Sequence, residues 1–189
     1  PYPNPEIREA LERGLTLCES VNPDLLLATD PDADRVGIAV PHNGEYVLLT
    51  GNEVGILLTD YVARIRRERG EDLSQAVVVS TIVSTAMVDA LAKDYGFQMR
   101  RTLTGFKHIG GQIALLEEAG RPDRYIMGFE ESYGYLVGTH VRDKDAVVAS
   151  MLICQMAEYH KARGFDLVAA MEELYEKYGF YKNITVSLS

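Results

Sequence analysis

Short apolar segments alternate with amphipathic segments over most of this 189-residue chain, and this alternation limits the possible folds more than any other feature. Glycines that follow the amphipathic segments, such as Gly96 and Gly120, are typical helix terminators. The expected order is strand 76–80, helix 85–95, strand 97–103, helix 110–119 and strand 125–128. This pattern predicts an α/β protein, a three-layer α/β/α sandwich with a mixed or parallel sheet, because each connecting helix must cover a face of the sheet.

The residues before this unit predict further helices and strands, the first of which belong to part of a preceding, similar domain. Asn4 as cap and Pro5 in the first turn indicate the start of a helix. Asn43 and Gly44 form a typical hairpin turn, and Thr50-x-x-Glu53 is a capping box that opens a helix ending at Gly70. Further strands are expected at residues 25–29, 36–40 and 46–49.

We place the domain boundary at the hairpin, so that residues 1–45 end the first domain and residues 46–189 form the second. The second domain is expected to finish with two helices, at 144–163 with Asp143 as cap and at 166–178. The last segment, residues 181–189, alternates apolar and polar positions and predicts a strand or an exit linker.

The overall composition excludes several classes of function. A net charge of −9 leaves no basic stripe that could neutralise a nucleic-acid backbone. The longest apolar run is too short to cross a membrane. Cys18 and Cys154 lie far apart in apolar helical patterns, which predicts buried, reduced thiols in a cytoplasmic protein. The chain starts with Pro1 rather than Met, in a linker-like stretch, so we expect a piece of a longer polypeptide.

Three aspartates at alternating positions, Asp30, Asp32 and Asp34, directly follow the strand at 25–29. In an extended segment residues i, i+2 and i+4 share one face, so the three carboxylates are expected to meet at one spot. Each pair of carboxylates ~4 Å apart repels by roughly 4 kcal/mol, which a divalent cation between them removes. Mg²⁺ fits best, because it uses a few carboxylates and keeps other positions for water or phosphate oxygen.

Three other kinds of structure also place acidic residues close together in a short loop. A solvated acidic turn is possible, but the apolar residues on both sides hold the loop at strand ends and favour a metal site. A calcium-binding EF-hand loop is excluded, because it needs Gly and Glu where Arg35 and Pro41 stand. A haloacid-dehalogenase-type phosphatase, with Asp30 as nucleophile, usually has Thr or Val at the position of Asp34. That class stays open as an alternative.

A second polar loop, at residues 102–111, follows a predicted strand and leads into a helix. Ligands bind at such positions in open α/β sheets. Gly105 permits close approach of the backbone, the helix N-terminus favours an anion, and Lys107 adds a cation. A plain turn with a solvated lysine explains the same residues equally well.

A third polar loop follows the strand at 125–128. Glu130, Glu131 and Ser132 offer carboxylates and a hydroxyl that suit the recognition of vicinal sugar hydroxyls, although Glu131 could equally be solvated. Further on, Lys144 offers an anion contact at a helix start, but capping by Asp143 beside a surface lysine is the simpler interpretation from local sequence.

Three motifs in this order, Thr-Asp-Pro-Asp-Ala-Asp-Arg, Thr-Gly-Phe-Lys-His-Ile-Gly and Gly-Phe-Glu-Glu-Ser-Tyr-Gly, closely resemble the α-D-phosphohexomutases, the phosphoglucomutase and phosphomannomutase family. The resemblance implies phosphoglucomutase-like domains, with this chain covering the end of the second and all of the third. It also implies an Mg²⁺ cofactor and a hexose phosphate substrate. By this resemblance, the metal is bound by Asp30, Asp32 and Asp34, and Arg35 and Lys107 take part in catalysis. The substrate is bound by Gly105, Glu130, Ser132 and Lys144.

The resemblance implies that a phosphoryl group passes from an enzyme phosphoserine to a hexose phosphate and returns from a bisphosphate. The family's Ser-His-Asn-Pro loop, which carries that serine, and its Arg-x-Ser-Gly-Thr loop, which holds the substrate phosphate, are absent from these residues. We therefore expect these 189 residues alone to be inactive and to need the remaining domains of the same polypeptide. A phosphatase and a non-catalytic module that binds metal or sugar phosphate stay as alternatives.

Overall fold

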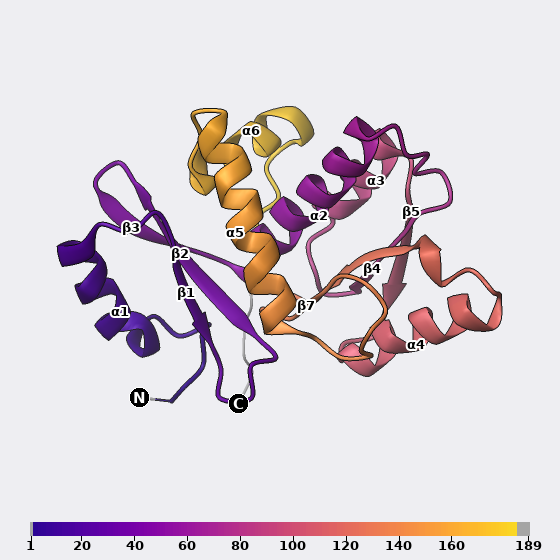
Figure 1. Ribbon diagram of the computed structural model, residues 1–189, viewed down its shortest axis with the longest axis horizontal. Helices are drawn as coiled ribbons and strands as arrows, with labels where there is room; N and C mark the ends of the chain where they lie inside the picture. Colours follow the sequence, from indigo (N-terminus) through magenta and orange to yellow (C-terminus); the bar gives the residue numbers. More distant parts are fainter. Residues whose placement is uncertain (1, 185–189) are drawn as a thin grey trace.

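A computed structural model of the chain describes residues 2–184 and contains two β-sheets with a long helix between them (Figure 1). The first sheet is antiparallel and consists of β1 (Leu26–Thr29), β2 (Val36–His42) and β3 (Glu45–Leu49), preceded by α1 (Arg8–Val21). The second sheet has the order β5-β4-β6-β7, with a parallel centre and one antiparallel edge. Its strands are β4 (Val77–Thr81), β5 (Gln98–Thr102), β6 (Tyr125–Phe129) and β7 (Tyr135–Leu136).

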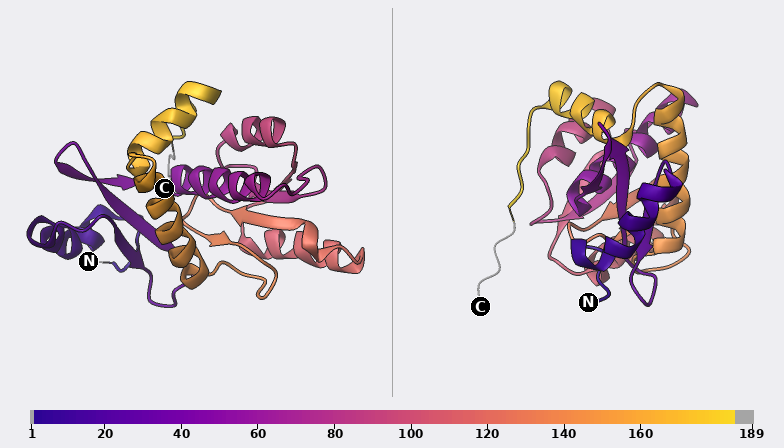
Figure 2. Two further views of the ribbon diagram at one scale, coloured as in Figure 1. Left: turned by 45° about the horizontal axis from the view of Figure 1, so that its top comes forward. Right: turned by 90° about the vertical axis from the view of Figure 1, so that its left-hand side faces the viewer.

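Helices cover both faces of the second sheet, which confirms the predicted α/β/α sandwich (Figure 2). On one face Ile109 and Ile113 of α4 (Phe106–Glu118) pack against Val77 and Val79. Val78 points to the opposite face, as expected for successive residues of a strand. That face is covered by α2 (Gly51–Glu68) and α3 (Met87–Tyr95), with the short helix η1 (Pro122–Arg124) leading into β6.

Two C-terminal helices connect the sheets. The helix α5 (Ala146–Ala162) contacts both β2 and β7, and α6 (Leu167–Tyr178) contacts β2 and α2. A main-chain hydrogen bond of 3.1 Å from Ala146 to Ala33 joins the start of α5 to the acidic loop. The packing of α5 therefore holds the loop that follows β1 next to the second sheet. None of the helices in the described part of the chain combines the length and hydropathy that a membrane crossing requires.

The predicted hairpin turn and the predicted capping box at the start of α2 are confirmed. Asn43 and Gly44 have φ values of 49° and 87°, as a type I′ hairpin turn requires. The Thr50 hydroxyl accepts a hydrogen bond from the Glu53 main-chain N–H, and the Glu53 carboxylate accepts one from the Thr50 N–H at 2.7 Å. This capping box satisfies main-chain donors that would otherwise have no partner at the start of α2.

Replacing Thr50 by Ala is expected to lower the free energy of unfolding by about 1 kcal/mol, because the Glu53 N–H loses its acceptor. Urea unfolding of the variant and the wild type measures this change. Thr16→Ala is the matched control, since Thr16 is exposed inside α1 and alanine is the better helix former there. Equal unfolding midpoints for Thr50→Ala and the wild type would contradict a stabilising role for the box.

Three helix starts differ from the sequence prediction. Asn4 is not the cap of α1, because its side chain closes an earlier turn by accepting from the Glu6 N–H, and the helix begins at Arg8. The helix α4 begins at Phe106 rather than 110, so that Lys107 lies on its first turn. The cap of α5 is Asp145 rather than Asp143, with its carboxylate accepting from two main-chain N–H groups. For α5, two aspartates close together in sequence competed for the same capping role. The starts of α1 and α4 have no side-chain cap, since they follow Ile7 and Gly105.

The expectation for Cys154 was wrong, and the domain boundary stays a prediction. Cys18 is buried as predicted, but Cys154 is exposed on α5. The boundary between residues 1–45 and 46–189 stays a prediction, and β3, which it assigns to the second domain, pairs with β2 in the first sheet. Residues 181–184 contain no helix or strand, and the rest of the segment 181–189 lies outside the described residues.

Candidate functional site

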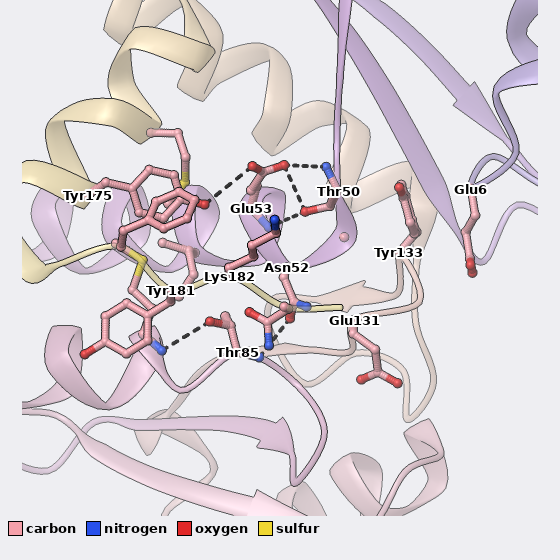
Figure 3. A pocket seen from close by; sticks show the side chains of 16 residues that line it. Glu6, Thr50, Asn52, Glu53, Thr85, Glu131, Tyr133, Tyr175, Tyr181 and Lys182 are labelled. Atoms are coloured by element: carbon pink, nitrogen blue, oxygen red, sulfur yellow. Dashed lines mark hydrogen bonds between the residues drawn. The ribbon is translucent and has the colours of Figure 1, made fainter. Parts of the chain in front are cut away.

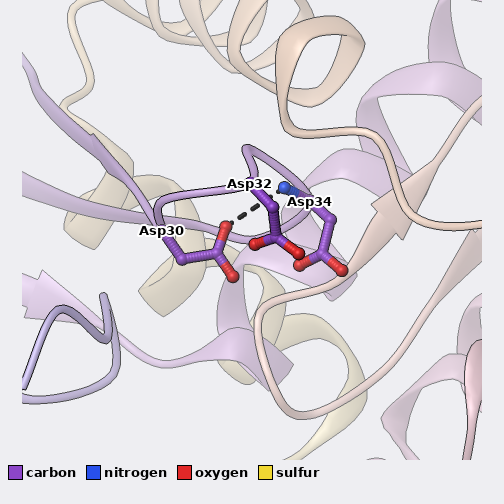
Figure 4. Close-up of side chains that lie close together, drawn as sticks. All are labelled: Asp30, Asp32 and Asp34. Carbon is purple, nitrogen blue, oxygen red and sulfur yellow. Dashed lines mark hydrogen bonds between the residues drawn. The ribbon is translucent and has the colours of Figure 1, made fainter.

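The three aspartates meet at one spot, as predicted (Figure 4). One carboxylate oxygen from each of Asp30, Asp32 and Asp34 lies within 4.8 Å of the other two. The loop is not extended, however, because it forms a tight turn in which Ala33 has a φ of 54°. The convergence therefore comes from this turn between β1 and β2. Asp30 is buried, Asp34 is half-buried and Asp32 is exposed, so the cluster opens toward solvent at Asp32.

Asp30 is fixed by its neighbours in the loop. Its Oδ1 accepts hydrogen bonds from the N–H groups of Asp34 and Arg35 at 3.1 and 3.0 Å, and its Oδ2 accepts from Arg35 Nε at 2.9 Å. Burial alone would raise the pKa of Asp30, but these hydrogen bonds outweigh it and lower the pKa to about 2. A carboxylate has about four acceptor positions, so Asp30 keeps about one for a further ligand.

Asp34 forms an ion pair with Lys144, which lies just before α5. Lys144 Nζ is 2.7 Å from Asp34 Oδ2 and 3.3 Å from Asp143 Oδ1. Burial would lower the pKa of Lys144, but the bond to Asp34 raises it above its ordinary value. Burial, together with the charge of Asp30, raises the pKa of Asp34 despite that bond. Lys144 is thus part of the acidic site, rather than the plain surface lysine that local sequence suggested.

The chemistry of this donor set fits Mg²⁺. Three carboxylates on one loop provide hard oxygen ligands, and small movements would bring the three oxygens within reach of a single ion. The exposed side at Asp32 leaves room for water or phosphate oxygens, which Mg²⁺ usually retains. Arg35 borders the cluster through its contact with Asp30, and its Nη1 also lies 3.3 Å from Glu6 Oε1.

The acidic loop is paired directly with the loop that follows β6. The Val36 N–H donates to the Tyr133 carbonyl at 3.1 Å, and Arg35 and Gly134 form an isolated antiparallel bridge. The Glu130 N–H in turn donates to the Gly134 carbonyl at 2.9 Å. Tyr133 has a φ of 65°, a conformation that is uncommon for a residue with a side chain and indicates a constrained turn. Two of the predicted site loops therefore form one unit.

The two glutamates of this loop hold neighbouring segments in place. Glu130 is buried, and its Oε1 accepts from the Gly105 N–H at 2.7 Å, which joins the second and third polar loops. Burial raises the pKa of Glu130. Glu131 is not simply solvated, since its Oε2 accepts from the hydroxyls of Thr81 and Ser84 at 2.8 and 3.0 Å. Glu131 thus binds the residues at the C-terminal end of β4.

Lys107 and Ser132 stay outside these networks. Lys107 is exposed on the first turn of α4 and Ser132 is half-exposed, and neither side chain is hydrogen-bonded to another residue in the described range 2–184. Gly105, held by Glu130, has a φ of 112° that only glycine adopts readily. The structure thus forms two networks of hydrogen bonds and ion pairs. The first contains Asp30, Asp34, Arg35 and Lys144, and the second contains Gly105 and Glu130. The two networks meet at Gly134, which pairs with both Arg35 and Glu130.

A cavity of about 310 Å³ is lined in part by the third loop and by the start of α2 (Figure 3). The acidic triad does not line it, but Glu6, Glu131 and Tyr133 do, and Glu6 also pairs with Arg35. Glu6, Tyr133 and Gly51 were not identified as site residues from the sequence. At Gly51 the start of α2 packs against the third loop. The glycine at the first position of this helix could have indicated the close contact, because glycine lets two main-chain segments approach each other.

Comparison with protein families identifies both parts of the chain. Residues 50–178 match the family described as phosphoglucomutase/phosphomannomutase, alpha/beta/alpha domain III, and residues 1–44 match alpha/beta/alpha domain II of the same family. The human protein named glucose 1,6-bisphosphate synthase is 39% identical over 184 residues, which cover 95% of this chain and 29% of that protein. A phosphoglucomutase from Staphylococcus aureus is 36% identical over 185 residues, with coverages of 97% and 32%.

The fold has close counterparts among solved structures. A crystal structure from Thermus thermophilus, of a protein assigned as a phosphomannomutase, superposes with a TM-score of 0.73 and 27% identity. The superposition covers 94% of this chain and 36% of that one. The chain spans about a third of the length of the curated relatives that it matches.

Proposed function

Because this chain belongs to the phosphoglucomutase/phosphomannomutase family, we propose that it is part of an enzyme that interconverts a hexose 1-phosphate and a hexose 6-phosphate. Glucose phosphates are the proposed substrates, since the Gly-Phe-Lys-His and Glu-Glu-Ser-Tyr-Gly motifs resemble those of phosphoglucomutases. The observation that carries the proposal is the direct pairing of the acidic loop with the Glu130–Gly134 loop. This pairing sets a candidate metal site beside a candidate sugar site.

The metal site of the proposed enzyme consists of Asp30, Asp32 and Asp34. Mg²⁺ bound there would supply positive charge that stabilises phosphoryl oxygens while a phosphate ester bond breaks. Arg35 has two tasks in this proposal. Its main-chain N–H and its Nε hold Asp30 in place, and its guanidinium adds a fixed positive charge at the edge of the site. The donor of the phosphoryl group is a phosphoserine in another part of the polypeptide, and a hexose bisphosphate is the intermediate.

The sugar is proposed to bind along the third loop. Ser132 is accessible for a hydroxyl group, while Glu130 fixes Gly105 and so shapes the backbone that faces the substrate. Lys144, whose stem passes Gly134, and Lys107, on the first turn of α4, supply cations for the substrate phosphate or for proton transfer. His108, next to Lys107 on α4, is the third candidate for proton transfer. We also propose that the enzyme acts in the cytoplasm, in keeping with its free cysteines.

The phosphatase alternative has less support. A haloacid-dehalogenase-type mechanism needs Asp30 as a freely accessible nucleophile. Asp30 is 4% exposed, and both of its oxygens already accept hydrogen bonds. These bonds lower its reactivity and block most directions of attack, which favours a metal ligand over a nucleophile at this position.

The proposal is tested by phosphorus NMR of the purified full-length protein with glucose 1-phosphate, Mg²⁺ and a catalytic amount of glucose 1,6-bisphosphate. We expect glucose 6-phosphate to appear, and removal of Mg²⁺ with EDTA to stop the reaction. The 189-residue chain alone is expected to give no turnover. Release of inorganic phosphate would support the phosphatase instead, and binding of the sugar phosphate without any conversion would support a non-catalytic module.

A further inference from the structure

Lys144 and the proposed metal ion need the same carboxylate. Asp34 Oδ2 lies 2.7 Å from Lys144 Nζ, and Asp34 is also one of the three converging ligands. Two cations on one carboxylate repel each other strongly at such distances. An ion that binds Asp30, Asp32 and Asp34 together therefore weakens the hold of Asp34 on Lys144.

Arg35, the other cation of the site, is held differently. It is fixed to Asp30 by bonds from both its main-chain N–H and its Nε, and it pairs with Glu6 as well. Lys144 holds Asp34 by a single ammonium group at the end of a flexible chain. Its second partner, Asp143, is mostly exposed and lies 3.3 Å away, so the ammonium group has an alternative contact. Lys144 is the cation that can leave.

The aliphatic part of the Lys144 side chain packs against the third loop. A Cβ atom on Gly134 would lie only 2.7 Å from Lys144 Cδ, which shows how closely the lysine stem passes the Glu130–Gly134 segment. A lysine that leaves Asp34 therefore stays beside the proposed sugar site. Its positive charge then becomes available to an anionic group of the substrate.

On this basis we infer that Lys144 and the divalent cation compete for Asp34, so that metal binding releases the Lys144 ammonium group toward the substrate side of the third loop. This inference rests on the proposed metal site. It makes Lys144 a positioning residue whose location depends on whether the metal is bound, in addition to any direct contact with the substrate.

The first test is the affinity of the purified full-length protein for Mn²⁺, measured by calorimetry. Lys144→Met removes the competing charge while keeping most of the stem, and we expect it to bind Mn²⁺ about five- to tenfold more tightly than the wild type. Lys144→Arg keeps the charge and is expected to stay within about threefold of the wild type. Lys107→Met is the matched control, because it removes an equal charge from an exposed site and is expected to change the affinity much less.

The second test is the rate at which an amine-acylating reagent modifies Lys144, followed by mass spectrometry. Saturating Mn²⁺ is expected to increase this rate severalfold and to leave the rate at Lys107 unchanged. One Mn²⁺ bound per protein, with equal affinity in the wild type, Lys144→Met and Lys107→Met and no change in acylation, would overturn the competition alone. Failure of the wild type to bind Mn²⁺ would overturn the metal site of the proposed function and the competition with it.

Discussion

Replacing Asp32 by Asn is expected to lower the turnover number of the phosphoryl transfer about a hundredfold and to leave the unfolding midpoint unchanged. Asp32 is the exposed member of the triad, so its carboxylate has little part in holding the fold. The amide has nearly the same shape but no negative charge, which weakens the binding of a divalent cation. Mutase activity at saturating Mg²⁺, Mn²⁺ affinity by calorimetry and urea unfolding together measure the three quantities.

A matched control separates the site from the general charge of the protein. Asp123→Asn makes the same chemical change at an exposed position in η1, which leads into β6 from the end of the sheet opposite to the site loops. We expect this variant to keep full activity. If Asp32→Asn retained wild-type turnover and Mn²⁺ affinity, the acidic loop would not be the metal site.

Replacing Gly51 by Ala is expected to destabilise the protein by about 3 kcal/mol. A Cβ atom at this position would lie 2.1 Å from the Glu131 carbonyl oxygen and 2.8 Å from the Tyr133 nitrogen. Both are main-chain atoms, which cannot rotate away as a side chain can. The start of α2 and the third loop would have to separate, so we also expect sugar-phosphate binding to weaken. Urea unfolding and calorimetric titration with glucose 6-phosphate measure the two effects.

Gly111→Ala is the matched control for this prediction. Gly111 is exposed within α4, and a Cβ atom there would have no neighbour within 4 Å. Alanine favours the helix over glycine by about 1 kcal/mol, so this variant is expected to gain stability. A loss of stability of the same size in both variants would contradict the close packing of Gly51 as the cause.

Much of the fold could be predicted from the sequence because its signals are local. The type I′ turn at Asn43 and Gly44 and the capping box of Thr50 and Glu53 involve residues within one turn of the chain. The helix starts near Asn4 and Asp143 were wrong because several polar residues nearby can cap a helix or close a turn. Only the geometry of the packed helix selects among them.

The candidate site also has a part that the sequence predicted and a part that it did not. The meeting of Asp30, Asp32 and Asp34 was predictable because all three lie in one short loop after a strand, although the loop turns rather than extends. The resemblance to phosphohexomutases pointed to the same residues. Neither source predicted that Glu131 closes the end of β4, since its partners Thr81 and Ser84 come from a distant part of the chain.

The sequence by itself determined the order of strands and helices, the acidic loop and the family, because periodicity, turn residues and motifs are written in neighbouring positions. Only the tertiary structure decided that Lys144 pairs with Asp34, that Glu130 binds the Gly105 N–H and that Gly51 touches the third loop. These contacts join residues far apart in the chain. They depend on how α5 and the two sheets pack together, and no local preference of a residue encodes that packing.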